Sequence, residues 1–166
     1  MLYTNNQLKQ KLDKEIALLF RNTKSEKINK LSAKSVTYKD FLSNKMLIIA
    51  MIRQGVPYSL FNLIQNTTPF SESDWAMILD ISTKSLQRYK QSDRNFKPLQ
   101  SEKIIEIAEV TEFGLDVLGD ANKFKLWLYT PNFALGNHKP IELLKNSYGK
   151  DMVLGELTRI NHGIFI

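Results

Sequence analysis

The segment that decides the fold of this chain lies in its last third, where residues 127–144 read WLYTPNFALGNHKPIELL. Apolar residues recur at helical spacing at its start: Phe124, Trp127 and Leu128. Pro131 ends this predicted helix, because proline lacks the amide hydrogen that a helix interior needs. A loop with Gly136 follows, and Pro140 stands where the first turn of another helix tolerates it. These signals predict a small helical module.

The last segment of the chain, residues 149–163, reads GKDMVLGELTRINHG and predicts a helix opened by glycine. Its apolar residues share one stripe: Val153, Leu157 and Ile160. Gly163 is a natural helix terminator. Ile164, Phe165 and Ile166 follow it, and consecutive large apolar residues are unfavourable in water unless something covers them. Either the module's own core or a partner is expected to cover this tail.

The order of these features resembles the C-terminal toxin-binding domain of Xre/MbcA/ParS-type antitoxins, which pair with RES-domain toxins. The pattern runs tryptophan-leucine, proline-asparagine, leucine-glycine, proline with a leucine pair, then a helix ending in arginine-isoleucine-x-x-glycine. As a pattern of several elements it is more specific than any one piece. It implies a toxin-binding domain over 120–166 and these toxin contacts: Asn132, Leu135, Gly136, Arg159, Asn161, His162, Gly163, Ile164 and Phe165.

The middle of the chain has the spacing of a helix-turn-helix. Ser71 and Asp74 form a capping pattern for a first helix that carries Trp75, Ile78 and Leu79. Ala76 is small enough for a second helix to cross closely, and Leu86 stands ten residues later as an apolar anchor. Asp80 occupies the turn position that often holds glycine, and aspartate tolerates the left-handed conformation better than most residues.

The second helix of this motif predicts a DNA-recognition face opposite Leu86. Arginine and glutamine bond base edges bidentately, while lysine and serine suit phosphates. An ordinary solvated helix face is the alternative explanation for the same residues. The spacing and the resemblance favour DNA binding, and the predicted contacts are Thr83, Lys84, Ser85, Gln87, Arg88 and Gln91.

The N-terminal part carries the excess positive charge. The chain has a formal net charge of +6, and residues 1–45 hold 10 Lys/Arg against 4 Asp/Glu. An amphipathic helix is predicted over 6–21, a polar linker over 22–36 and a helix over 38–54, with another opened by Pro57. Residues 1–37 are interpreted as a basic, partly flexible segment, either a solvated leader or an arm that adds phosphate contacts.

A further helix is predicted after Pro98, with Ser101 as its cap and Ile104, Ile105 and Ala108 on one face. The opposite face carries an acidic stripe: Glu102, Glu106 and Glu109. We expect this stripe to be solvated and to point away from DNA, because it would repel phosphates.

Several classes of function lack their sequence signals. The chain has no cysteine, no apolar segment of signal-peptide or membrane-spanning length, no glycine-rich phosphate loop and no metal-ligand spacing. Its histidines, His138 and His162, have no ionisable partner at a motif spacing and are expected to be surface or helix-end residues. We therefore expect a cytoplasmic protein that is not an enzyme and needs no metal or cofactor.

The predicted fold is all-α, with an Xre-like helix-turn-helix domain over 38–119 followed by the small helical toxin-binding domain. The resemblance implies an antitoxin that occludes the active site of a RES-domain toxin, an NAD-degrading or ADP-ribosylating enzyme. It also implies repression of its own operon by a homodimer bound to operator DNA. Two alternatives are a stand-alone regulator with a C-terminal dimerisation module and an interaction module whose helix-turn-helix binds no DNA.

Overall fold

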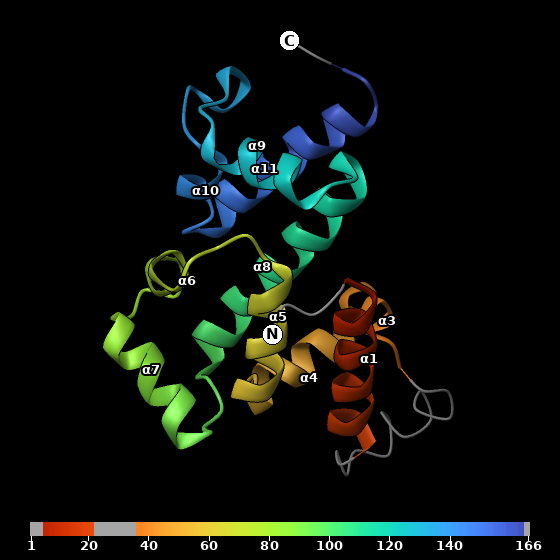
Figure 1. The fold of residues 1–166 in the computed structure, drawn as a ribbon, viewed down its shortest axis with the longest axis vertical. Coiled ribbons are helices and arrows are strands. Elements are labelled where there is room, and N and C mark those ends of the chain that lie inside the picture. Colours follow the sequence, from red (N-terminus) through yellow and green to blue (C-terminus); the bar gives the residue numbers. More distant parts are fainter. Residues whose placement is uncertain (1–4, 22–35, 165–166) are drawn as a thin grey trace. The chain divides into compact units, whose positions relative to one another are not determined.

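The structure, a computed structural model, describes residues 5–21 and 36–164, which fold into helices and short loops without a named strand, as predicted (Figure 1). The helices are α1 (Asn5–Arg21), α3 (Tyr38–Ser43), α4 (Lys45–Gln54), α5 (Tyr58–Thr67), α6 (Glu72–Ile78), α7 (Thr83–Ser92), α8 (Pro98–Leu118), α9 (Ala121–Tyr129), the 3-10 helix η1 (Phe133–Leu135), α10 (Pro140–Leu143) and α11 (Ser147–Asn161). The linker predicted over 22–36 lies almost entirely outside the described residues.

The contacts divide the chain into two compact units. The first contains the described residues up to Thr67 together with Gln87–Ile105, and the second contains Thr68–Leu86 and the residues from Glu106 onward. In the first unit α1 packs on α3 and α5. Its core is rich in aromatic residues: the Phe96 ring stacks on Tyr89 with centroids 4.2 Å apart and meets Phe61 at 4.9 Å.

The single helix predicted over 38–54 is wrong, because Asn44 divides it into α3 and α4. Asn44 has an extended backbone (φ −113°, ψ 101°), and its side-chain oxygen accepts hydrogen bonds from the backbone N–H groups of Met46 and Leu47. Asparagine competes with the backbone in this way and thus favours caps over helix interiors. Thr37 and Asp40 form a capping box at the start of α3.

Ser101 does not cap α8, because that helix already begins at Pro98. The Ser101 side chain is buried in the first turn, where its Oγ accepts a hydrogen bond from the backbone N–H of Val56 at 2.8 Å. The hydroxyl in turn donates to the backbone oxygen of Phe96 at 3.1 Å. Ser101 therefore joins the segment after α4 to the start of α8 within the first unit.

The second unit contains the C-terminal module, in which α10 packs on α9 and α11, and η1 packs on α11. Its core contains Phe124, Leu128, Leu135, Val153 and Leu157. The proline and glycine signals are confirmed: α9 ends before Pro131, Pro140 is the first residue of α10, and Gly163 follows α11 with φ +70°.

The helix α11 begins two residues before the predicted glycine. Asn146 caps it, accepting a hydrogen bond from the backbone N–H of Gly149 at 2.9 Å. Gly149 lies against α10, where a Cβ atom built on it would stand 1.9 Å from the backbone oxygen of Leu143. Gly155, in the same helix, has no described atom within 4 Å of its would-be Cβ. Close packing explains the first glycine and does not explain the second.

The two glycines of α11 predict opposite effects of the same substitution. Gly149→Ala should destabilise the chain by more than about 3 kcal/mol, since the new methyl group collides with backbone. Gly155→Ala should stabilise it by about 0.5–1 kcal/mol, because alanine loses less backbone entropy in a helix. Urea unfolding of both variants measures the difference, and equal effects would contradict the close approach at Gly149.

Candidate functional site

The helix-turn-helix geometry is present between α6 and α7. The Ser71 hydroxyl accepts from the backbone N–H of Asp74, and the Asp74 carboxylate accepts from that of Ser71, which is the capping box that the sequence predicts. Asp80 adopts φ +52° in the turn, the left-handed conformation expected for it. The backbone N–H of Ile81 then donates to the oxygen of Ala76 at 3.0 Å. Aspartate thus fills the turn position without a glycine.

The helix α7 presents most of the predicted DNA contacts to solvent. Leu86 is buried, as predicted, while the exposed side chains are Thr83, Lys84, Gln87, Arg88 and Gln91. Ser85 is half-buried, and its hydroxyl lies 2.9 Å from the Ser82 hydroxyl. The Ser82 hydroxyl also accepts a hydrogen bond from the backbone N–H of Ser85. Ser85 therefore has a structural role at the start of the helix, whereas DNA contact by the others stays a prediction.

Further exposed cations follow this face and were not among the predicted contacts. Lys90 lies on α7, and Arg94 and Lys97 lie in the loop between α7 and α8. The same loop carries Asp93, with φ +47°. Cations after a recognition helix are suited to phosphate contacts, and the signal in the sequence was their charge rather than any motif.

Asn132 organises the loop between α9 and α10. Its side-chain oxygen accepts from the backbone N–H of Ala134, and its backbone N–H donates to the oxygen of His138 at 3.1 Å. Its own backbone oxygen accepts from both Leu135 and Asn137. Gly136 has φ +67° at the end of η1. Asn132 is half-buried and Gly136 is exposed, and both determine the shape of this loop.

Leu135, which the resemblance implies as a toxin contact, is buried at 3% exposure in the core of the module. Its side chain is not available to a partner in this structure, because the module itself covers it. Phe133, two residues earlier, is 75% exposed and was not among the predicted contacts. Phe133 is therefore an exposed aromatic side chain of this loop, which the spacing of the motif alone did not single out.

The remaining predicted toxin contacts lie at the end of α11 and just after it. Arg159 is half-buried, with its Nη1 3.7 Å from a carboxylate oxygen of Glu156. The exposed residues are Asn161, His162, Gly163 and Ile164. Phe165 lies outside the described residues, as does Ile166.

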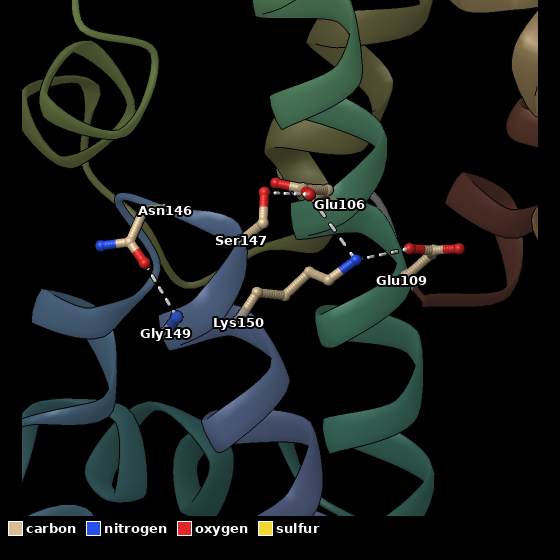
Figure 2. A network of polar contacts seen from close by, with 6 residues as sticks. All are labelled: Glu106, Glu109, Asn146, Ser147, Gly149 and Lys150. Atoms are coloured by element: carbon tan, nitrogen blue, oxygen red, sulfur yellow. Dashed lines mark hydrogen bonds and ion pairs between the residues drawn. The ribbon is translucent and has the colours of Figure 1, made fainter.

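The acidic stripe of α8 is not the solvated face that the sequence predicted. Glu106 is only 8% exposed and Glu109 is half-buried, while Glu102 is exposed. Figure 2 shows the Lys150 side chain of α11 reaching between the two carboxylates, with its Nζ 3.6 Å from Glu106 and 3.5 Å from Glu109. The Ser147 hydroxyl donates to Glu106 at 3.2 Å. Glu106 and Glu109 therefore contact α11, whereas Glu102 stays exposed.

A second polar contact joins α6 to α9. The Tyr129 hydroxyl donates to the Asp74 carboxylate at 2.6 Å. Partial burial raises the pKa of Asp74, but the hydrogen bonds from Ser71 and Tyr129 outweigh it, so that the pKa is lowered. Burial, together with the bond to Asp74, raises the pKa of Tyr129 well above its usual range. Asp74 is therefore held as a carboxylate and Tyr129 as a neutral phenol.

Within 5–21 and 36–164, no three His, Cys, Asp or Glu side chains gather as a possible metal site. The helices in these ranges are each too short or too polar to cross a membrane.

Two families match consecutive parts of this chain. Residues 47–109 match the antitoxin Xre-like helix-turn-helix domain, and residues 114–163 match the antitoxin Xre/MbcA/ParS C-terminal toxin-binding domain. Together the two matches cover the helix-turn-helix and the C-terminal module in the order that the sequence predicts.

Individual proteins are similar as well. The chain is 27% identical to an antitoxin Xre of Yersinia enterocolitica over 124 residues, which is 74% of this chain and 84% of that protein. An antitoxin Xre of Photorhabdus laumondii is 28% identical over 116 residues, 69% of this chain and 78% of that protein. The fold is similar to a chain of the crystal structure of the M. tuberculosis MbcT–MbcA toxin–antitoxin complex. That likeness has a TM-score of 0.53 and 21% identity, over 64% of this chain and 94% of that chain.

Lys150→Met should destabilise the chain by about 3 kcal/mol, because it removes a cation that contacts two partly buried carboxylates. Adding Glu106→Gln should recover part of the loss, since one of the two charges is removed. Urea unfolding of the single variants and the double variant gives the coupling free energy. Additive effects would contradict the network of Figure 2.

The lowered pKa of Asp74 predicts a loss of stability in acid. The folded state holds this carboxylate charged at a lower pH than the unfolded state does, so its contribution is present above the unfolded pKa of about 3.9. The contribution disappears as the pH falls through the folded pKa. Asp74→Asn should therefore lose less unfolding free energy than the parent when the pH falls from 5 to 3. These two values lie about one unit above and below the unfolded pKa of an aspartate. Parallel curves would refute this role.

Proposed function

The chain belongs to the Xre/MbcA/ParS family of antitoxins, and on that premise we propose that it neutralises a RES-domain toxin and represses its own operon. That it is an antitoxin of a toxin–antitoxin system follows from the family itself. The toxin class, the mechanism of inhibition and DNA binding are the proposal. In this proposal a helix-turn-helix domain over 38–119 binds DNA and a domain over 120–166 binds the toxin.

One observation carries the proposal: a helix-turn-helix match over 47–109 directly precedes a toxin-binding match over 114–163 in one chain. The similar fold from the MbcT–MbcA complex is an antitoxin or toxin chain seen with its partner. The RES class of toxin comes from the sequence resemblance, in which antitoxins of this pattern pair with RES-domain enzymes. An antitoxin has no need of its own catalytic centre, which agrees with the lack of catalytic motifs in the sequence.

Inhibition is proposed to occur by occlusion of the active site by the residues at and after the end of α11. The described residues Asn161, His162 and Ile164 are exposed, and Ile164 has 53% of its surface open to solvent. Such a side chain is available to a partner. Arg159 suits a pocket that binds phosphate groups, since its guanidinium forms paired hydrogen bonds with anionic oxygens.

Repression is proposed to occur through α7, whose exposed face carries Lys84 and Arg88. A homodimer is the expected form on DNA, because helix-turn-helix proteins read two half-sites about one helical turn apart.

Co-expression tests the toxin assignment. A gene for a RES-domain protein is expected beside the gene of this chain, and its expression alone should stop growth and deplete cellular NAD. Expression together with this chain should restore both, and the two proteins should co-purify. Growth arrest that this chain does not relieve would refute the proposed partner.

Removing the two cations of the α7 face should weaken operator binding. Lys84→Ala with Arg88→Ala is expected to cost about 1–3 kcal/mol if Arg88 contacts a base, and to reduce the salt dependence of binding. Toxin neutralisation should persist. Lys123→Ala with Lys145→Ala removes the same charge from exposed positions of the C-terminal module and serves as the control. Unchanged affinity in the α7 variant would refute the recognition face.

Removal of residues 161–166 tests occlusion. The truncated chain should fold and bind its operator as the parent does, yet fail to restore growth and NAD. Ile164→Asp is a milder variant that leaves α11 intact and should weaken neutralisation in the same direction. A truncated chain that neutralises fully would falsify occlusion by this segment, while one that unfolds would show that the segment belongs to the core.

A further inference from the structure

The helix α11 has a second side-chain stripe on the face opposite its core contacts. The inner face contains Gly149, Val153 and Leu157, which are buried. Since successive residues turn by about 100° around an α-helix, steps of four and three residues return to one side. The residues on the outer side form what is here called the outer stripe: Tyr148, Met152, Gly155, Arg159 and His162.

The first half of the outer stripe is apolar and open to solvent. Tyr148 is 87% exposed and Met152 is 49% exposed, one helical turn apart. A single exposed apolar residue needs no explanation, but a tyrosine and a methionine side by side on a helix have the composition of an interface core. Tyrosine supplies a large contact area at a low entropy cost, and methionine adapts its shape to a partner.

Gly155 is the observation that the fold does not explain. A glycine in a helix interior costs about 0.5–1 kcal/mol relative to alanine. Its backbone is helical, and no described atom lies within 4 Å of its would-be Cβ, so the chain's own packing does not require it. A close approach by another molecule would account for it, because the missing side chain leaves the helix backbone open there.

We propose that the outer stripe is the docking surface for the toxin, which seats a small ridge over Gly155 between Met152 and Arg159. This inference rests on the proposed function and names the surface that it uses. The stripe lies within residues 114–163, the part of the chain that matches a toxin-binding domain. It also runs directly into His162 and Ile164, the segment proposed to occlude the active site.

The two surfaces have different tasks. The outer stripe supplies apolar contact area along about two turns of helix, which fixes the toxin against α11. The residues after Asn161 then start from one end of this contact and need to span only a short distance. Arg159 and His162, at that end, are among the predicted toxin contacts, whereas Tyr148, Met152 and Gly155 are not.

The test is a substitution that fills the gap without harming the fold. Gly155→Leu in the full chain should keep or raise the melting temperature, because leucine is a better helix former and the position is exposed, with open space around a Cβ atom. Its affinity for the purified RES-domain toxin, measured by calorimetry, should fall by about a hundredfold. The affinity of the Tyr148→Ala variant for the toxin should fall by at least about tenfold. Asn62→Leu adds the same side chain to an exposed position of α5 and should bind as the parent does.

The outcomes separate this surface from the function on which it rests. If the parent binds the toxin and Gly155→Leu binds equally well, the outer stripe is not the docking surface, while the proposed function stands. If the parent does not bind, both proposals are overturned. If Gly155→Leu leaves toxin affinity unchanged but converts a dimer to a monomer in sedimentation, the stripe faces a second copy of this chain, which also overturns the proposal.

Discussion

Two glutamates, Glu106 and Glu109, stand on the covered side of α8, and one cation contacts both of them. Lys150 is that cation, and it lies on α11, so the rotation of α11 about its own axis is constrained. A turn by a single residue, about 100°, would carry Lys150 away from both carboxylates. Ion pairs of this kind add little net stability, which comes instead from apolar side chains such as Val153 and Leu157. The charges select one arrangement among those that the apolar core permits.

The constraint extends to the exposed side of the helix. With Lys150 directed at α8, the positions opposite to it are turned outward, and Tyr148 and Met152 are displayed to solvent. Asp74 acts in a similar double way in α6. It completes the capping box with Ser71 and accepts a hydrogen bond from the Tyr129 hydroxyl, so one carboxylate both starts a helix and holds α9. In both cases a polar group that defines a helix locally also places it against another helix.

The sequence was sufficient wherever the cause of a feature is local. The capping boxes at Thr37 and Ser71, the left-handed turn at Asp80, and the helix ends at Pro131 and Gly163 depend on neighbouring residues only. The sequence was misleading where the role of a residue depends on a partner that is distant in the sequence. Ser101 resembles a cap but binds Val56, 45 residues away, and the acidic stripe resembles a solvated face until Lys150 covers it. Asn44 lies between these two cases. Its capping hydrogen bond is local, but the apolar pattern around it continues without a break and predicts a single helix.

The residues of the proposed docking surface were not predicted from the sequence for the same reason, because their role depends on surroundings that are distant in the sequence. In α11 the periodicity of Val153, Leu157 and Ile160 indicates one apolar face, and a search for amphipathic helices treats the other residues as a neutral remainder. Tyr148, Met152 and Gly155 become informative only when the structure shows that the chain leaves them uncovered. A glycine that packing requires, such as Gly149, and one that packing does not require are identical in sequence. The difference between them lies in their surroundings: backbone atoms of Leu143 lie against Gly149, whereas the space beside Gly155 is open. The free-energy cost of a helical glycine is therefore explained by the fold at Gly149 and not at Gly155.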